Sequence, residues 1–100
     1  MSTITREEIF DRIKRRVVDE LCLTKNECDK VKLETDLVKD LNADELDAVE
    51  CLLDIEDEFG INIPEEHCET YGMNGNEFKM SKAVDYVYDT FNPPQVPPEK

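Results

Sequence analysis

A chain of 100 residues is long enough for one small domain with a single hydrophobic core, and no second domain is indicated. Its 25 acidic and 12 basic side chains give a formal net charge of −13, which repels nucleic-acid phosphates and anionic lipid. We therefore expect no nucleic-acid and no membrane partner, and a monomer whose protein partners carry basic patches. Only 7% of the residues are aromatic and there is no tryptophan, which favours a small helical bundle.

The N-terminal segment and the cysteines bear on the compartment. The first residues lack the apolar core of a signal peptide, and no apolar run approaches the length of a transmembrane helix. None of the four cysteines belongs to a Cys-x-x-Cys pair; they are Cys22, Cys28, Cys51 and Cys68. We expect reduced thiols in a cytoplasmic protein, and residence in an organelle after processing stays open.

The first predicted helix starts near Thr5, because Thr5 and Glu8 have the Thr-x-x-Glu spacing of a capping box. Its apolar residues recur at intervals of three and four and share one face. They are Phe10, Ile13, Val17 and Leu21. We expect this helix to end around Cys22 or Leu23.

Residues 24–43 contain no long periodic run. Apolar residues are scattered there among Lys, Asp, Glu and Thr, and they are Val31, Leu33, Leu37, Val38 and Leu41. A loop of about 20 residues is unusual inside a compact domain, so we predict a long connection held to the core by these apolar anchors.

The strongest helix signal covers residues 45–59. Asp44 is a good N-cap, and Glu45 and Asp47 place negative charge in the first turn, where the helix dipole favours it. Gly60 follows as a candidate C-cap. The predicted apolar face consists of Leu46, Val49, Leu52, Leu53, Ile55 and Phe59.

Two shorter helices are predicted near the C-terminus. The first has Pro64 at its first position and runs to about Tyr71, and the loop 72–76 follows it. Ser81 is expected to cap the second, which runs over residues 82–91. Its predicted inner face consists of Ala83, Val84, Val87, Tyr88 and Phe91.

The domain division follows from these elements. Residues 1–91 are predicted to form one helical bundle. Residues 92–100 are rich in proline, and we expect a flexible, polyproline-like tail that is free of the core.

Residues 40–47 read Asp-Leu-Asn-Ala-Asp-Glu-Leu-Asp, which resembles the helix-start motif of acyl carrier proteins, Asp-Leu-Gly-Ala-Asp-Ser-Leu-Asp. Residues 63–66, Ile-Pro-Glu-Glu, and residues 83–87, Ala-Val-Asp-Tyr-Val, are similar to later landmarks of that family. The resemblance covers about residues 5–91 and implies an all-α, four-helix bundle with a long first loop and a short third helix. The first loop is longer than in the family pattern, and residues 72–80 look like an insertion.

Glu45 stands where the family has a serine. That serine carries a 4'-phosphopantetheine arm, whose thiol holds the acyl group. The transfer needs a hydroxyl that becomes a stable phosphodiester, whereas a carboxylate would give an acyl phosphate that hydrolyses readily. Ser2, Thr35 and Ser81 lie outside the motif, so we expect no cofactor. Glu45 could imitate the charge of the phosphodiester, but a favourable place in the first helical turn explains it more simply.

The resemblance also implies a partner-binding surface, because basic patches of partner enzymes dock on the second helix of acyl carrier proteins. The matching carboxylates, with Asp54 as an addition, are Asp44, Asp47, Glu50, Asp54, Glu56 and Asp57. The alternative is that they form the solvated polar face that any bundle helix has.

No metal or catalytic site is predicted. His67 and Cys68 lie between Glu66 and Glu69, but their spacing matches no zinc site. Residues 36–47 are acidic but lack the central glycine and final glutamate of a calcium loop. With a single histidine no nucleophile–base pair can be argued, so we expect no enzyme.

Three functions remain after these exclusions. The leading one is a non-enzymatic, acyl-carrier-like module that binds proteins through its acidic second helix. The second is an acyl carrier of fatty-acid or polyketide-type biosynthesis in which Glu45 is an engineered or atypical substitution. The third is a small bundle that binds lipid between its helices.

Overall fold

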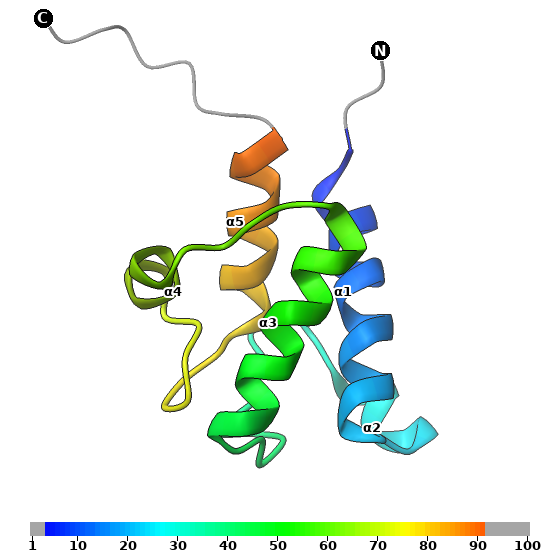
Figure 1. Cartoon of the computed structure of the whole chain (residues 1–100). Helices are drawn as coiled ribbons and strands as arrows, with labels where there is room; N and C mark the ends of the chain where they lie inside the picture. The colour runs from blue at the N-terminus through cyan, green and yellow to red at the C-terminus, as the bar shows by residue number, and fades with distance from the viewer. Residues whose placement is uncertain (1–3, 92–100) are drawn as a thin grey trace, which may run out of the picture.

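The computed structural model describes residues 4–91, which form five helices (Figure 1). They are α1 (Arg6–Leu21), α2 (Lys25–Lys30), α3 (Glu45–Phe59), α4 (Glu65–Tyr71) and α5 (Met80–Phe91). Helix α1 packs against both α3 and α5 and runs antiparallel to them, and the short α4 lies crosswise beside α5. The only β contacts among these residues are two isolated antiparallel bridges. The predicted all-α class is confirmed, and the predicted proline-rich tail lies outside the described residues.

The ends of α1 agree with the prediction. The Thr5 side chain accepts a hydrogen bond from the backbone N–H of Glu8 at 3.1 Å, as an N-cap does. Cys22 ends the helix in the left-handed conformation at φ 53°, and the N–H of Leu23 donates to the Val18 carbonyl at 3.0 Å. The buried face is Ile9, Ile13 and Val17, while the predicted Phe10 and Leu21 are half-buried.

Helix α2 is a correction to the predicted long loop. Thr24 and Glu27 form a full capping box, with Thr24 Oγ1 accepting from the Glu27 N–H at 3.2 Å. No residue of α2 is buried, so there was no apolar period to detect. The Thr-x-x-Glu pattern was the available signal. Among the predicted anchors Val31 and Leu37 are buried, but Leu33 is 49% exposed.

The loop that follows α2 is hydrogen-bonded to the start of α5. Asp36 Oδ1 accepts from the N–H groups of Val38, Lys39 and Phe78 at 2.9–3.1 Å. The N–H of Met80 donates to the Thr35 carbonyl at 2.9 Å, and that of Ser81 to Leu33 at 2.8 Å. These carbonyls satisfy first-turn donors of α5. The helix therefore begins at Met80, and the predicted Ser81 cap is wrong.

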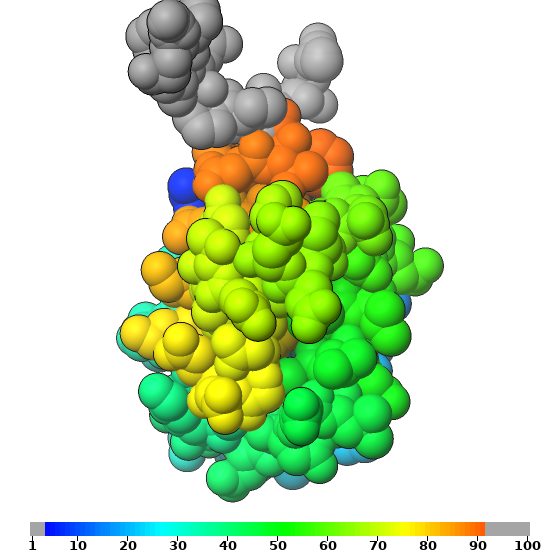
Figure 2. All heavy atoms as spheres, turned by 60° about the vertical axis from the view of Figure 1, so that its left-hand side comes forward, coloured from blue at the N-terminus to red at the C-terminus, as the bar shows by residue number. Residues whose placement is uncertain are grey.

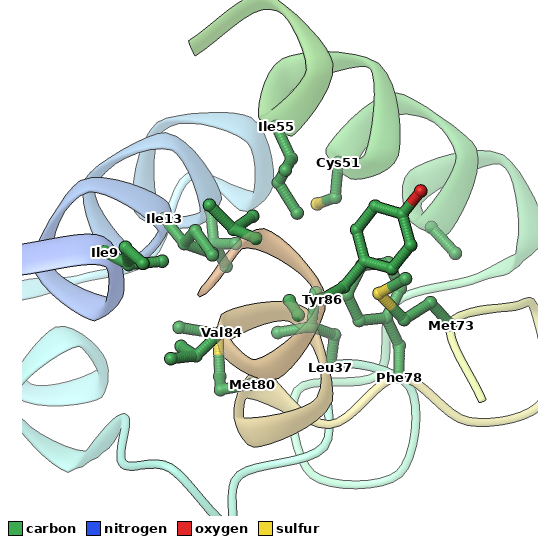
Figure 3. Packing of buried hydrophobic residues seen from close by; sticks show 14 of the residues in the cluster. Ile9, Ile13, Leu37, Cys51, Ile55, Met73, Phe78, Met80, Val84 and Tyr86 are labelled. Carbon is green, nitrogen blue, oxygen red and sulfur yellow. The ribbon is translucent and has the colours of Figure 1, made fainter. Parts of the chain in front are cut away.

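The core lies between α1, α3 and α5, and the 72–79 segment adds to it (Figure 3). Met73 and Phe78, from this segment, are fully buried. On α5 the predicted Ala83, Val84 and Val87 are buried together with Tyr86, which the prediction omitted. Tyr88 is half-buried and Phe91 is 47% exposed. The predicted inner face therefore extended too far along the helix toward its C-terminal end. Pro64 is the N-cap of α4 and not its first helical residue.

Candidate functional site

The N-terminal end of α3 is held by a capping box between Asp44 and Asp47. Asp44 Oδ1 accepts from the Asp47 N–H at 2.8 Å, and the Asp44 N–H donates to Asp47 Oδ2 at 3.3 Å. The predicted N-cap is confirmed. Both carboxylates thus have a structural role in capping the N-terminus of α3, whether or not they also contact a partner.

An apolar stripe runs along the outer face of α3. Its members are Leu46, Val49 and Leu53, which are 64%, 47% and 56% exposed. They recur at intervals of three and four, so they lie on one side of the helix. The sequence placed all three on the core face, and that placement is wrong. The predicted Ile55 and Phe59 are buried, and Ala48 and Cys51 complete the core face.

An open groove of about 460 Å³ lies beside this stripe, between α3 and α4. Its apolar lining is Val49, Leu52, Leu53, Ile63, Cys68 and Met73. Four carboxylates also line it, from Glu45, Glu56, Glu65 and Glu69. Figure 2 shows this side of the molecule, with α4 and the 72–79 segment beside α3. The site therefore combines an apolar floor with negative charge.

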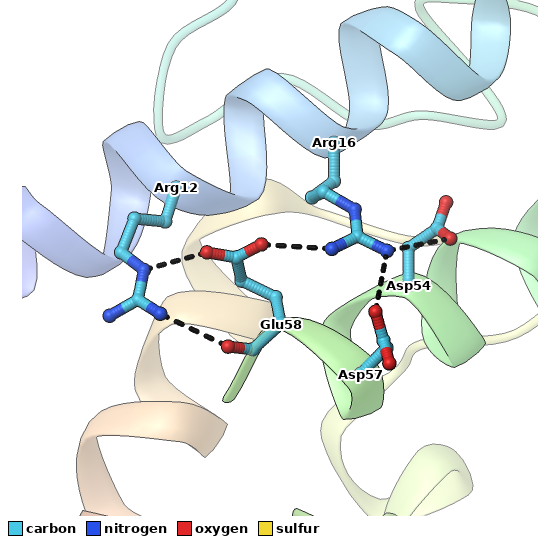
Figure 4. Close-up of polar contacts among 5 residues, drawn as sticks. All are labelled: Arg12, Arg16, Asp54, Asp57 and Glu58. Atoms are coloured by element: carbon cyan, nitrogen blue, oxygen red, sulfur yellow. Dashed lines mark hydrogen bonds and ion pairs between the residues drawn. The ribbon is translucent and has the colours of Figure 1, made fainter. Parts of the chain in front are cut away.

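The opposite side of α3 faces α1, and its carboxylates are paired there (Figure 4). Arg16 contacts Glu58 at 2.9 Å, Asp57 at 3.2 Å and Asp54 at 3.3 Å. Arg12 donates to the Glu58 carboxylate at 2.8 Å and to its carbonyl at 3.0 Å. These contacts hold the pKa of Glu58 below its usual value, chiefly through the hydrogen bond from Arg12 and then that from Arg16.

The predicted partner-binding carboxylates therefore differ in whether they are covered by contacts within the domain or remain exposed to solvent. Asp54 is only 23% exposed and points to Arg16, so it belongs to the α1 contact, whereas Asp57 is 78% exposed beside the same arginine. Glu50 is exposed. Glu56 lines the groove, and its Oε2 accepts from the Ile63 N–H at 2.7 Å, which fixes the turn after α3.

Sequence reasoning missed Glu58, Arg12 and Arg16 as a set. A detectable signal existed, because Arg12 and Arg16 are four residues apart on α1, as Asp54 and Glu58 are on α3. Matching i, i+4 spacing lets two antiparallel helices meet with two pairs of opposite charge. It also missed Glu20, whose pKa is raised to about 7 by hydrogen bonds with Glu50 and then Asp54.

The side chains of His67 and Cys51 have structural roles. His67 Nδ1 lies 2.8 Å from the Tyr86 hydroxyl, which links α4 to α5. Cys51 is buried in the core, and burial raises the pKa of its thiol to about 12, so it packs there as a small apolar side chain. Within residues 4–91 no three His, Cys, Asp or Glu side chains converge as metal ligands, and no helix is long and apolar enough to cross a membrane.

Glu45, the first residue of α3, is contacted by Gly75 from the predicted insertion. A Cβ atom added to Gly75 would lie 2.9 Å from Glu45 Cγ and 3.2 Å from Glu45 Cα, so the two residues are in close contact. Glu45 is nevertheless exposed to solvent. The insertion thus reaches back to the start of α3.

Comparison with known proteins identifies the fold. No model of a known protein family matches the chain. A protein from Anaplasma phagocytophilum assigned as an acyl carrier protein has a similar structure, with a TM-score of 0.73 and 22% identity over 90% of this chain and 96% of that chain. An acyl carrier protein of high thermal stability from Enterococcus faecalis is similar with a TM-score of 0.63 and 29% identity, over 86% of this chain and 98% of that chain. The chain therefore has the fold of acyl carrier proteins.

Proposed function

We propose that the protein is a non-enzymatic, acyl-carrier-like interaction module that binds other proteins through α3 and carries no acyl group. The observation that carries the proposal is the exposed stripe of Leu46, Val49 and Leu53 beside a groove with an acidic lining. A contiguous exposed apolar surface with a polar rim is typical of a protein-interaction site.

The first part of the proposal concerns Glu45. The residues present do not fit 4'-phosphopantetheine, since a carboxylate cannot form the stable phosphodiester that the group requires. Thr35 and Ser81 do not replace the missing hydroxyl. Thr35 is buried, and its Oγ1 accepts from the Lys32 N–H at 2.8 Å, while Ser81 lies within the first turn of α5. Glu45 itself is an anion at a helix N-terminus, where it is favoured by about 0.3–1 kcal/mol.

The second part concerns the kind of partner. Burial of an exposed leucine side chain contributes up to about 1.5–3 kcal/mol, so the apolar stripe would supply most of the affinity. The exposed carboxylates of Glu50 and Asp57 would mainly raise the association rate with a basic partner. The partner expected from this surface has apolar side chains surrounded by Lys and Arg, as in proteins that recognise acyl carriers.

The decisive experiment uses cross-linking in the source cell to identify the partner, followed by binding kinetics with the purified pair. Leu53→Ser should weaken affinity at least tenfold, and the double variant Glu50→Lys, Asp57→Lys should slow association several-fold at low salt. Asp11→Lys with Asp29→Lys, at exposed positions on α1 and α2, is the matched control. Equal losses with the control pair and the α3 pair would contradict the proposal.

The carrier alternative is tested separately by mass spectrometry. After incubation with a phosphopantetheinyl transferase and coenzyme A, the mass of the protein should stay unchanged. A gain equal to the mass of the arm would make the protein a carrier and would remove the first part of the proposal.

A further inference from the structure

The segment between α4 and α5 forms a small hairpin whose tip touches the start of α3. Met73 and Phe78 are bridged as an antiparallel pair, and the N–H of Asn74 donates to the Glu77 carbonyl at 2.8 Å. Asn74 Oδ1 accepts from the N–H groups of Asn76 and Glu77 at 2.8 and 3.1 Å. We refer to residues 73–78 as the tip hairpin. Its turn is thus closed by three local hydrogen bonds.

The tip hairpin is fixed to the body of the domain. Both of its paired residues, Met73 and Phe78, are completely buried. The Phe78 N–H donates to Asp36 Oδ1 at 3.1 Å, and its carbonyl accepts from the Leu37 N–H at 2.8 Å. Moving the hairpin away from α3 would expose two large apolar side chains and break these bonds. It is therefore a fixed part of the surface.

The contact at residue 45 involves the part of the side chain that any residue there would share. A Cβ atom on Gly75 would be 3.1 Å from Glu45 Cβ and 3.2 Å from Glu45 Cα, so the hairpin backbone lies against the stem of the side chain. Gly75 permits this close approach because it has no side chain of its own. A shorter residue at position 45 would keep the same neighbour. In Figure 2 the yellow atoms of this segment lie against the green atoms of α3.

We propose that the tip hairpin is a second, steric barrier to phosphopantetheinylation, independent of the carboxylate of Glu45. This deepens the proposed function, on which it rests, because it makes the absence of a prosthetic arm a property of the surface and not of one residue. In the transfer, a serine Oγ–H would attack the phosphorus of the pantetheine phosphate of coenzyme A. The new O–P bond forms as the P–O bond to adenosine 3',5'-bisphosphate breaks, and the hydroxyl proton goes to a base of the transferase.

That reaction needs the whole region around the residue 45 oxygen to be open to an enzyme and to a large, in-line phosphate. The tip hairpin occupies one side of this region at van der Waals distance. Glu45→Ser by itself should therefore restore the nucleophile but not the access that the transferase requires.

The test compares Glu45→Ser with the same substitution in a chain whose residues 74–77 are replaced by Asn-Gly. A two-residue Asn-Gly turn can connect a facing pair such as Met73 and Phe78, so both buried side chains are kept. Each protein is incubated with a broad-specificity bacterial phosphopantetheinyl transferase and coenzyme A, with an ordinary acyl carrier protein as positive control. The arm is followed by mass, and folding is checked by circular dichroism.

We expect the shortened variant to be loaded at least tenfold faster than Glu45→Ser alone. Equal rates, or no loading of either variant, would overturn the inference and leave the proposed function standing. Loading of the unaltered chain would instead overturn the proposed function.

A second measurement does not depend on the shortened variant folding. Glu45→Cys and Glu50→Cys, on the same helix, are labelled with iodoacetamide and with a bulky maleimide, and peptide mapping locates each label. The ratio of the bulky to the small reagent's rate removes differences in thiol reactivity. We expect this ratio to be at least tenfold lower at position 45, and equal ratios would overturn the inference.

Discussion

The two long faces of α3 contain similar residues, but their surroundings differ. Toward α1, Asp54 and Glu58 are bound by Arg16 and are largely covered. On the outer side, Glu45 is exposed and lines the groove, and large apolar residues such as Leu53 face solvent. Acidic charge on this helix therefore has two roles. On one side it joins two helices, and on the other it is left available to a partner. The leucines and isoleucines of α3 are also divided between a buried side and an exposed side. The residue type alone does not show which side a given apolar residue occupies.

The largest expected difference between the two sides comes from a pair of apolar truncations on α3. Ile55 is fully buried, so Ile55→Ala should lower the free energy of unfolding by about 2–4 kcal/mol through lost burial and a new cavity. Leu53 is more than half exposed, and Leu53→Ala should change stability by no more than about 0.5 kcal/mol. Urea unfolding of both variants measures this.

The same pair should respond in the opposite order when a partner is present. Leu53→Ala is expected to weaken partner binding at a concentration where both proteins are folded, and Ile55→Ala is not. A large loss of stability in Leu53→Ala would show that the stripe is packed in solution, and would remove the basis for a docking surface.

Local sequence signals identified most helix ends because capping is a short-range interaction. As predicted, Thr5 and Asp44 cap the N-terminal ends of α1 and α3, and Gly60 caps the C-terminal end of α3. Ser81 failed for a reason that no local pattern contains. The N–H groups at the start of α5 are satisfied by carbonyls of the first loop, which are distant in sequence. The capping box of α2 was readable, but a six-residue helix without a buried residue gave no periodicity to support it.

The candidate site was predictable only in part. The importance of Glu45 and the choice of this acidic helix as a partner-binding surface both followed from the resemblance to acyl carrier proteins. Which carboxylates are paired depends on the rotation of α3 against α1, and six apolar residues around one helix left that rotation undetermined. The approach of Gly75 to Glu45 depends on the path of an insertion of irregular structure, for which pattern analysis has no rule.

The next largest effect is expected from the charge pairs on the α1 side. Glu58→Gln keeps the shape of the side chain but removes the charge that accepts from Arg12 and Arg16. Because hydrogen bonds to charged groups contribute about 1.5–3 kcal/mol and these are partly screened, a loss of about 1–2 kcal/mol is expected. Chemical denaturation at neutral pH measures it.

The control for this variant is Asp57→Asn, at the neighbouring position on α3. Its carboxylate is 78% exposed, so stability should change by less than about 0.5 kcal/mol. If both variants lost the same stability, the distinction between paired and available carboxylates on α3 would not hold.

The smallest effect concerns Glu20, which lies near the C-terminal end of α1 and faces α3. Its neighbours are Glu50 and Asp54 on α3, and Arg16, which lies one turn earlier on α1, binds Asp54. The folded-state pKa of Glu20 is raised to about 7, above its ordinary value of about 4.3. Between these two values the folded chain holds a proton that the unfolded chain has lost. Stability should therefore rise as the pH falls through this window, and the full repulsion should be present above about pH 7.

Glu20→Gln isolates this contribution, because the amide resembles the protonated acid and does not titrate. The variant should be more stable than the unaltered chain at about pH 8, and the difference should shrink as the pH falls and disappear below about pH 4. All other titratable groups are the same in the two proteins, so their contributions cancel in the difference. Thermal unfolding of both proteins at several pH values gives this difference directly. Parallel stability curves would mean that Glu20 stays ionised in the folded protein and that Glu50 does not act on it.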